Sequence, residues 1–145
     1  MNLGIYVPTL ANHEQLMDIS KSINENIGSK LSDASIFYDN IAYNPFKISC
    51  GVFNSTDLWN FKGTLITTSL QTTIKSTKIV NDITIYYYYG FETATDPLSL
   101  IYLKNNQIKF IAKDSNSKND FFRKTAEPVD FVASSFSEIV KELTK

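Results

Sequence analysis

The chain contains only one cysteine, one histidine and one arginine. The single cysteine excludes two kinds of site. A lone Cys50 cannot form an internal disulfide or a cysteine cluster that holds a metal. Its setting in KISCGVF predicts a buried and chemically quiet thiol. Other metal ligands are equally scarce, and the motifs that bind nucleotide cofactors are absent, so we expect no metal and no cofactor. The cysteine usage fits a reducing compartment.

The chain also lacks an excess of charge of either sign. It has 14 basic residues against 15 acidic ones, for a net charge of -1, and Arg123 is the only arginine. A protein that wraps DNA or RNA needs a concentrated basic face. We therefore expect no nucleic-acid partner.

Long apolar runs are missing as well. No segment approaches the roughly 18–20 apolar residues that cross a bilayer. The first residues, MNLGIYVPTLANHEQ, have no basic flank and become polar after Leu10, which is not the pattern of a signal peptide. We expect no membrane partner and a cytoplasmic location.

Short apolar, β-branched runs alternate with amphipathic segments along all 145 residues. This alternation predicts an α/β fold: a single doubly wound, mostly parallel, Rossmann-like sheet with helices on both faces, in one domain over 1–145. Segment 55–62 is compatible with a helical turn or an irregular loop. The predicted strands cover 3–8, 34–39, 47–54, 63–69, 83–90, 107–113 and 128–133, and the predicted helices cover 12–27, 70–78, 96–106, 117–127 and 134–145.

Polar residues at three helix starts predict capping. Asn12 is followed three residues later by Gln15, Thr68 by Gln71, and Ser135 by Glu138, each in a capping-box arrangement. Pro97 stands just inside the start of the helix over 96–106, where proline is favoured.

Four consecutive tyrosines, Tyr86 to Tyr89, form the most unusual stretch of the chain. One interpretation is a stacking platform for bases, but such platforms are interleaved with basic residues and none lies between Asp82 and Glu92. The other is a core strand in which Tyr87 and Tyr89 face one way and the intervening residues the other. We favour the core strand, with Tyr89 at the end where ligands of open α/β sheets bind.

Several familiar catalytic motifs are absent. The sequence contains no G-x-x-x-x-G-K-[ST], no G-x-G-x-x-G after its first strand, and no G-x-S-x-G around any serine. Catalytic residues therefore stay unassigned, and the sequence does not decide whether the protein is an enzyme.

If the sheet is parallel, the loops after its strands gather at the carboxyl edge, where helix N-termini favour anions. His13 could contact a phosphate or act as a base, or be an exposed first-turn residue. Asp57 and Glu92 could form a carboxylate pair or be solvated, and the serines could serve as caps. The candidate ligand-binding residues at this edge are His13, Asn54, Ser55, Asp57, Ser69, Tyr89, Glu92 and Ser115.

The stretch FNSTDLWNFKGTLITTSLQTTIK, followed by ITIYYYYGFE, resembles one Rossmann-like half of the two-domain, B-type glycosyltransferases. More narrowly, it is similar to small glycosyltransferase-like proteins of tailed phages. IKFIAKDSNSKNDFF and PVDFVASSFSEIVKEL add strand, loop and helix units of the same type. If the protein is phage-encoded, its location would be the host cytoplasm.

The resemblance implies that the domain binds a nucleotide, a nucleotide sugar or another phosphorylated ligand at the carboxyl edge of its sheet. In that family the sugar nucleotide binds mainly in a second domain, so a homodimer or a separate partner would supply the missing half. The alternative is a non-catalytic homodimeric interaction module that keeps the fold without the chemistry. We expect a homodimer in either case.

Overall fold

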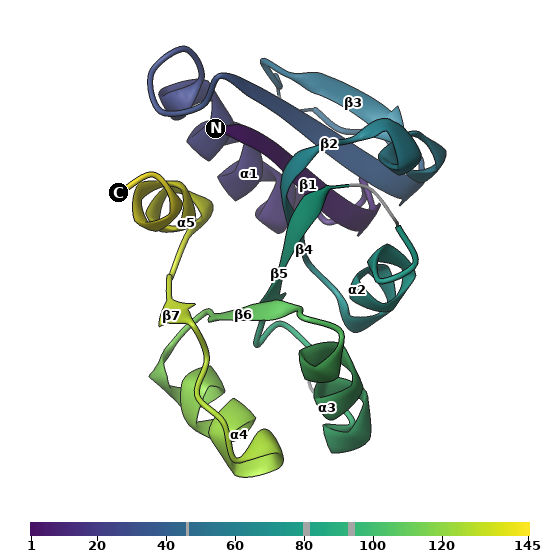
Figure 1. Cartoon of the computed structure of the whole chain (residues 1–145). Helices are drawn as coiled ribbons and strands as arrows, with labels where there is room; N and C mark the ends of the chain where they lie inside the picture. The colour runs from purple at the N-terminus through teal and green to yellow at the C-terminus, as the bar shows by residue number, and fades with distance from the viewer. Residues whose placement is uncertain (46, 80–81, 93–94) are drawn as a thin grey trace.

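A computed structural model of the chain describes residues 1–45, 47–79, 82–92 and 95–145 (Figure 1). The strands are β1 (Asn2–Thr9), β2 (Asp33–Asn40), β3 (Gly51–Asn54), β4 (Gly63–Thr67), β5 (Ile83–Tyr89), β6 (Lys109–Ala112) and β7 (Phe131–Val132). The helices are α1 (His13–Asn26), α2 (Leu70–Ser76), α3 (Pro97–Asn105), α4 (Ser115–Thr125) and α5 (Phe136–Leu143), with a 3-10 helix, η1 (Ser55–Asn60), after β3.

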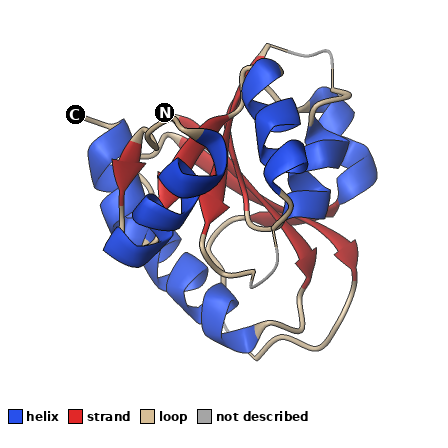
Figure 2. Ribbon diagram, turned by 90° about the horizontal axis from the view of Figure 1, so that it is seen from below, coloured by secondary structure: helices blue, strands red, loops and turns tan. Residues whose placement is uncertain are grey.

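The strands form one sheet in the order β3-β2-β1-β4-β5-β6-β7, and every neighbouring pair is parallel. Helices lie on both sides of it (Figure 2). This is the doubly wound, Rossmann-like order, so the predicted fold class is confirmed. The strand order reverses between β1 and β4, which is where ligands of such sheets usually bind.

The two faces of the sheet carry separate hydrophobic clusters. On one face, α1 and α5 pack over the sheet through side chains such as Ile19, Ile23 and Ile139. On the other face, η1, α2, α3 and α4 contribute Leu58, Ile74, Leu100, Leu103 and Phe121. Burial of a sheet on both faces explains why its central strands are almost continuously apolar in sequence.

The tyrosine strand β5 lies inside this core, as the alternation predicts. Tyr88 belongs to the α1–α5 side, whereas Tyr87 and Tyr89 belong to the opposite side, and all three are buried. The Tyr88 hydroxyl donates a hydrogen bond to the carbonyl of Ala133 at 2.6 Å. Burial raises the pKa of all three phenols, so they remain protonated donors at neutral pH.

Several predicted boundaries are wrong, although the elements themselves are present. The strand predicted over 47–54 begins only at Gly51, and the strand predicted over 107–113 begins only at Lys109. Gln107 has φ 65°, so it turns the chain before that strand. Segment 55–62 forms the 3-10 helix η1 over Ser55–Asn60. These boundary errors arise because apolar residues precede the first residue that pairs with a neighbouring strand.

Side-chain caps show how local hydrogen bonding starts the helices; at α3, for example, Asp96 accepts from the backbone N–H of Leu98. Asn12 accepts from the backbone of Gln15, and Ser135 accepts from that of Glu138, so both predicted caps are confirmed. The reciprocal bond of the predicted capping box is displaced at α5, because the Glu138 carboxylate accepts from the Ser134 backbone N–H at 2.7 Å. At α2 the predicted cap is wrong by one residue. Ser69 rather than Thr68 caps this helix, because Ser69 and Thr72 exchange side-chain and backbone hydrogen bonds as a capping box.

Gly90 ends β5 with a backbone that other residues rarely adopt. Its φ is +123°, and an added Cβ would lie 2.3 Å from the Ser117 hydroxyl oxygen. A glycine here lets the chain leave β5 beside α4. The following residues, Phe91 and Glu92, are thereby placed at the carboxyl edge.

Cys50 is half-buried, whereas the sequence predicts a buried thiol. The difference arises because the residue precedes β3, at the margin of the sheet, rather than lying within a strand. Burial, and secondarily the negative charge of Asp33, raise the pKa of the thiol to about 11. The thiol is therefore protonated at neutral pH.

We expect replacement of Tyr88 by phenylalanine to lower the free energy of unfolding by about 1–2 kcal/mol, because the buried Ala133 carbonyl loses its side-chain donor. Urea denaturation of the wild type and Tyr88→Phe measures the difference. Tyr86→Phe is the matched control, since Tyr86 lies two residues away on the same face and is only partly buried. Equal losses in the two variants would contradict a specific role for the Tyr88 hydroxyl.

Candidate functional site

The ends of all seven strands lie at one edge of the sheet because the strands are parallel. The polar loops after β1, β4, β5 and β6 therefore gather there. At the strand reversal, Thr68 crosses toward β1, and its backbone N–H and its hydroxyl both donate to the Tyr6 carbonyl, at 3.3 and 3.2 Å. At the switch point, the Thr68 donors and the Tyr6 carbonyl are thus already used in hydrogen bonds within the chain.

Glu92 occupies the start of α2, beside that switch point. Its carboxylate accepts from the Leu70 backbone N–H at 2.5 Å and from the Tyr87 hydroxyl at 3.2 Å. A carboxylate at a helix N-terminus is stabilised by the helix dipole and the free N–H groups. Glu92 therefore stands where an anionic ligand would otherwise bind.

The other helices that begin at this edge are capped in the same intramolecular way. Asp114 accepts from the Ser117 backbone at 2.7 Å, and Asp18 of α1 accepts from the Phe136 backbone at 3.1 Å. These are the same backbone donors that would bind a phosphate in the sequence-based hypothesis. Each of these caps occupies one of the free N–H groups of its helix start, so we expect cationic side chains to contribute much of the binding of any anion at this edge.

Two tyrosine–carboxylate clusters fix the face that carries η1, α2, α3 and α4. In one, the Tyr6 hydroxyl donates to Asp39 at 2.7 Å, and Lys75 pairs with the same carboxylate at 3.1 Å. Partial burial alone would raise the pKa of Asp39, but hydrogen bonds from Ser55, Tyr6 and Lys75 together lower it below its ordinary value.

In the second cluster, the Tyr89 hydroxyl donates to Asp120 of α4. Arg123 and Lys124 pair with the same carboxylate at 2.5 and 3.0 Å. The hydrogen bond from Tyr89 is the main reason that the pKa of Asp120 is lowered. Both carboxylates are consequently ionised and neutralised within the fold, which makes them structural anchors rather than proton donors.

A cavity of about 740 Å³, here called the carboxyl-edge crevice, opens between the start of α1 and the loops that follow β5, β6 and β7. Phe91 stands 47% exposed at its wall, and the Lys113 ammonium lies 5.2 Å from the centroid of that ring. Burial raises the pKa of Asp18, which also lines the crevice. The complete lining is Asn12, Glu14, Gln15, Met17, Asp18, Lys21, Phe91, Lys113 and Ser134.

The structure distributes the predicted site residues over several places. Tyr89 and Glu92 line a cavity of about 320 Å³ with Lys113 and Asp120, next to the crevice. Ser55 lines a separate cavity with Tyr6 and Asp39. Asp57 lines a third cavity, between β2 and the 3-10 helix η1. Asp57 and Glu92 therefore do not share a cavity.

The remaining candidates act mainly in local structure. Asn54 accepts from the backbone of Thr56 and Ser69 caps α2. Ser115 is exposed in the first turn of α4. His13 opens α1, but its side chain lies outside the described part of the structure.

Sequence reasoning did not identify Lys21 and Lys113 as residues of one cavity. Lys113 directly follows an apolar strand, which is a usable signal because strand ends carry ligand-binding residues. Lys21 is eight residues inside a helix, and nothing in its surroundings distinguishes it from an ordinary solvated lysine. Its position over the crevice depends on how α1 packs on the sheet.

Comparison with known proteins adds no family assignment, since no family model, curated protein or solved structure matches the chain. Among the described residues, no helix has the length and apolar character to cross a membrane. Nor does that part of the chain contain a group of three or more histidine, cysteine, aspartate or glutamate residues arranged to hold a metal.

We expect Asp39→Asn to lower the free energy of unfolding at pH 7 by about 1–2 kcal/mol, because Tyr6 and Lys75 lose a charged acceptor. A lowered folded pKa stabilises the protein above the unfolded-chain value of about 3.9, and this stabilisation disappears as the pH falls through the folded pKa. The difference between wild type and variant should therefore shrink toward pH 2–3. Denaturation at both pH values tests this, and a difference that grew on acidification would contradict it.

Proposed function

We propose that the protein binds a small phosphorylated ligand of the nucleotide or nucleotide-sugar class in the carboxyl-edge crevice. The observation that carries the proposal is the pairing of an exposed aromatic ring, Phe91, with two lysines, Lys21 and Lys113, in one cavity at the ligand-binding edge of a doubly wound sheet. The volume of about 740 Å³ is within the range of small-molecule sites.

The two lysines supply the positive charge that the capped helix N-termini do not. Neither Lys21 nor Lys113 forms an ion pair with another described residue, in contrast to Lys75 and Lys124. The Lys113 ammonium lies over the Phe91 ring, and because no ion pair holds either ammonium, both can also contact phosphate oxygens. Contact with a phosphate through point charges fits lysine chemistry.

Phe91 provides a surface for a planar group. Its ring is anchored edge-on against Tyr88, with centroids 4.9 Å apart and an interplanar angle of 73°. An anchored, exposed ring can stack on a nucleobase or on the apolar face of a sugar. The amides and carboxylates of Asn12, Gln15 and Glu14 offer hydrogen-bond acceptors to ligand hydroxyls.

The proposal concerns binding and leaves catalysis unassigned. The resemblance to glycosyltransferases favours a nucleotide sugar over a free nucleotide. Asp39, Glu92 and Asp120 are held in structural hydrogen bonds, and Asp18 in the crevice accepts from the Phe136 backbone, so we assign none of them as a catalytic acid or base.

A thermal-shift and calorimetric screen with uridine, guanosine and adenosine diphosphates and their hexose conjugates tests the proposal. A ligand present at a hundred times its dissociation constant stabilises the native state by about 2.7 kcal/mol. We expect Lys113→Gln and Phe91→Ala each to weaken binding roughly five- to thirtyfold, as the loss of about 1–2 kcal/mol implies.

Lys30→Gln is the matched control for charge. Lys30 is exposed in the turn after α1, at the opposite edge of the sheet, so its loss should leave binding unchanged. No shift with any member of the panel, or equal weakening by Lys30→Gln and Lys113→Gln, would contradict the proposal.

A second candidate function, a homodimeric interaction module, is favoured by the composition of α3. This helix is apolar on all sides: Leu100 and Leu103 are buried against the sheet, whereas Leu98, Ile101 and Tyr102 are exposed. Phe122 is also exposed on α4, which packs beside α3. A helix that is hydrophobic all round is normally buried, which suggests that a second copy covers this surface.

Sedimentation velocity discriminates this candidate from a monomeric ligand-binding domain. We expect wild-type protein to sediment as a dimer and Ile101→Asp to sediment as a monomer, because a buried charge without a partner opposes association. Ile41→Asp serves as control, since Ile41 is equally apolar and 78% exposed in the loop after β2. Monomeric wild type at high concentration would exclude the α3 interface.

A further inference from the structure

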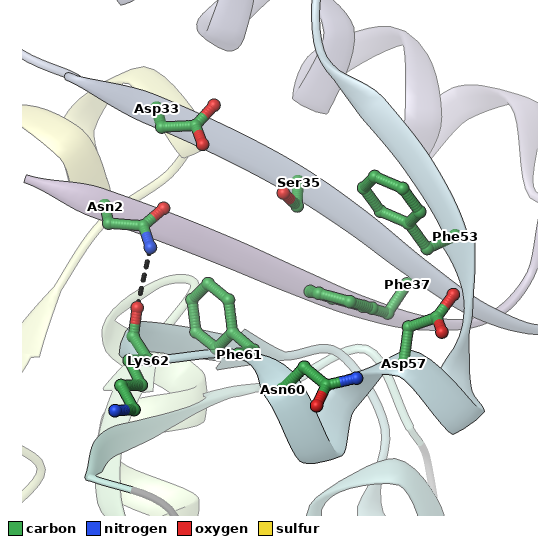
Figure 3. Close-up of a pocket in the computed structure, with 9 residues that line it drawn as sticks. All are labelled: Asn2, Asp33, Ser35, Phe37, Phe53, Asp57, Asn60, Phe61 and Lys62. Atoms are coloured by element: carbon green, nitrogen blue, oxygen red, sulfur yellow. Dashed lines mark hydrogen bonds between the residues drawn. The ribbon is translucent and has the colours of Figure 1, made fainter.

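A second groove lies away from the carboxyl-edge crevice, on the face of β1, β2 and β3 that carries η1, where η1 leaves part of the sheet open. It has a volume of about 390 Å³ and lies between the start of β1 and β2 and the 3-10 helix η1 (Figure 3). We call it the open-face groove. Its lining is Asn2, Asp33, Ser35, Phe37, Phe53, Asp57, Asn60, Phe61 and Lys62.

Phenyl rings form its apolar surface. Phe37 and Phe53 are register partners on β2 and β3, with ring centroids 6.0 Å apart, and Phe61 meets Phe37 edge-on at 5.5 Å. Phe53 is 42% exposed, so this ring presents apolar surface to the groove. A Cβ added to Gly51 would lie 2.4 Å from the Phe53 ring, which shows that the ring lies directly on the strand backbone.

Carboxylates stand at both ends of these rings. Figure 3 shows Asp33 at one end of the groove and Asp57 at the other, with the rings of Phe37 and Phe53 at the latter end and Phe61 between. Asp33 and Phe37 are four residues apart on one strand, which corresponds to about 13 Å. The groove is therefore elongated, and its two negative charges are far apart.

These two carboxylates differ from the anchored ones elsewhere in the fold. Neither Asp33 nor Asp57 forms an ion pair with any described residue, whereas Asp39 and Asp120 do. The Asp33 carboxylate accepts a hydrogen bond from the Ala34 backbone N–H at 2.9 Å, which leaves its charge without a cation. Lys62 is the one cation in the lining, and in Figure 3 its ammonium extends away from Asp33. With two acids and one lysine, the lining has a net charge of -1, which disfavours a phosphorylated ligand.

The other polar groups present acceptors to a donor-rich ligand. The Asn2 side-chain amide donates to the Lys62 carbonyl at 2.6 Å, and its Oδ1 is buried without a hydrogen-bond partner in the described part of the chain. Ser35 and Asn60 add a hydroxyl and an amide oxygen. Buried acceptors without a donor are rare in native proteins.

We propose that the open-face groove binds an aliphatic polyamine, with one ammonium group at Asp33, another at Asp57 and the hydrocarbon chain on the phenyl rings. Each part of such a ligand finds its complement: cations meet carboxylates that form no ion pair and aromatic faces, and methylene groups meet apolar surface. The site is independent of the phosphorylated-ligand crevice in position and in charge.

Isothermal titration calorimetry with spermidine tests the proposal on the full chain, with butylamine and Mg²⁺ as comparison ligands. We expect saturable spermidine binding with one site, weakened about three- to fivefold by Asp33→Asn and by Asp57→Asn, and weakened further by the double variant. Phe53→Ala should weaken spermidine more than it weakens Mg²⁺, since only the polyamine contacts the ring.

Asp82→Asn is the matched control, because Asp82 is an exposed aspartate that precedes β5 and does not line the groove. The proposal is overturned if spermidine does not bind, if Asp82→Asn weakens it as much as Asp33→Asn, or if butylamine and Mg²⁺ bind as tightly. Self-association that Phe53→Ala abolishes would overturn it too, because the groove would then be an interface between two copies. Circular dichroism of each variant confirms that a loss of binding is not a loss of fold.

Discussion

The buried hydroxyl groups of β5 impose the constraint on which the rest of the structure depends. A tyrosine ring gains from burial, but its hydroxyl must keep a hydrogen bond or the gain is lost. Each of the three buried phenols finds a partner in a different part of the chain: Tyr88 at the end of β7, Tyr87 in the loop after β5, and Tyr89 on α4. Hydrogen bonds from a single strand thus tie both sides of the sheet and its carboxyl edge together.

The requirement that polar groups keep hydrogen-bond partners also shapes the electrostatics of the ligand-binding edge. Glu92 and Asp18 place carboxylates on backbone donors at the starts of α2 and α5. The fold therefore gains caps at the expense of the anion sites that Rossmann-like proteins commonly use. This explains why the candidate crevice depends on Lys21 and Lys113, and why a second, negatively charged groove can exist on another face without competing for the same ligand.

The fold was predictable from the sequence because its signals are local. Alternation assigns the faces of Tyr87 and Tyr88, and caps such as Asn12 and Ser135 mark helix starts within a few residues. The sites were not predictable in the same way. Whether Asp57 shares a cavity with Glu92 or with Asp33 depends on the path of η1 across the sheet, and no local pattern encodes that path. The one-residue error at Ser69 has a similar cause, since either hydroxyl could cap and the geometry after β4 decides.

The central position of β1 has a consequence for how the protein is made. β1 is synthesised before every other strand, yet it lies between β2 and β4, and its pairing with β4 has to wait until Thr67 has left the ribosome. Until then one edge of an apolar strand containing Leu3, Ile5 and Val7 is open. Parallel pairings between distant segments form slowly and leave such edges exposed to other chains. Nascent chains that have not yet reached β4 should therefore be the species most dependent on chaperones. The yield of folded protein should also respond to the rate of translation through α2 and β5, because β4 leaves the ribosome while these later segments are added.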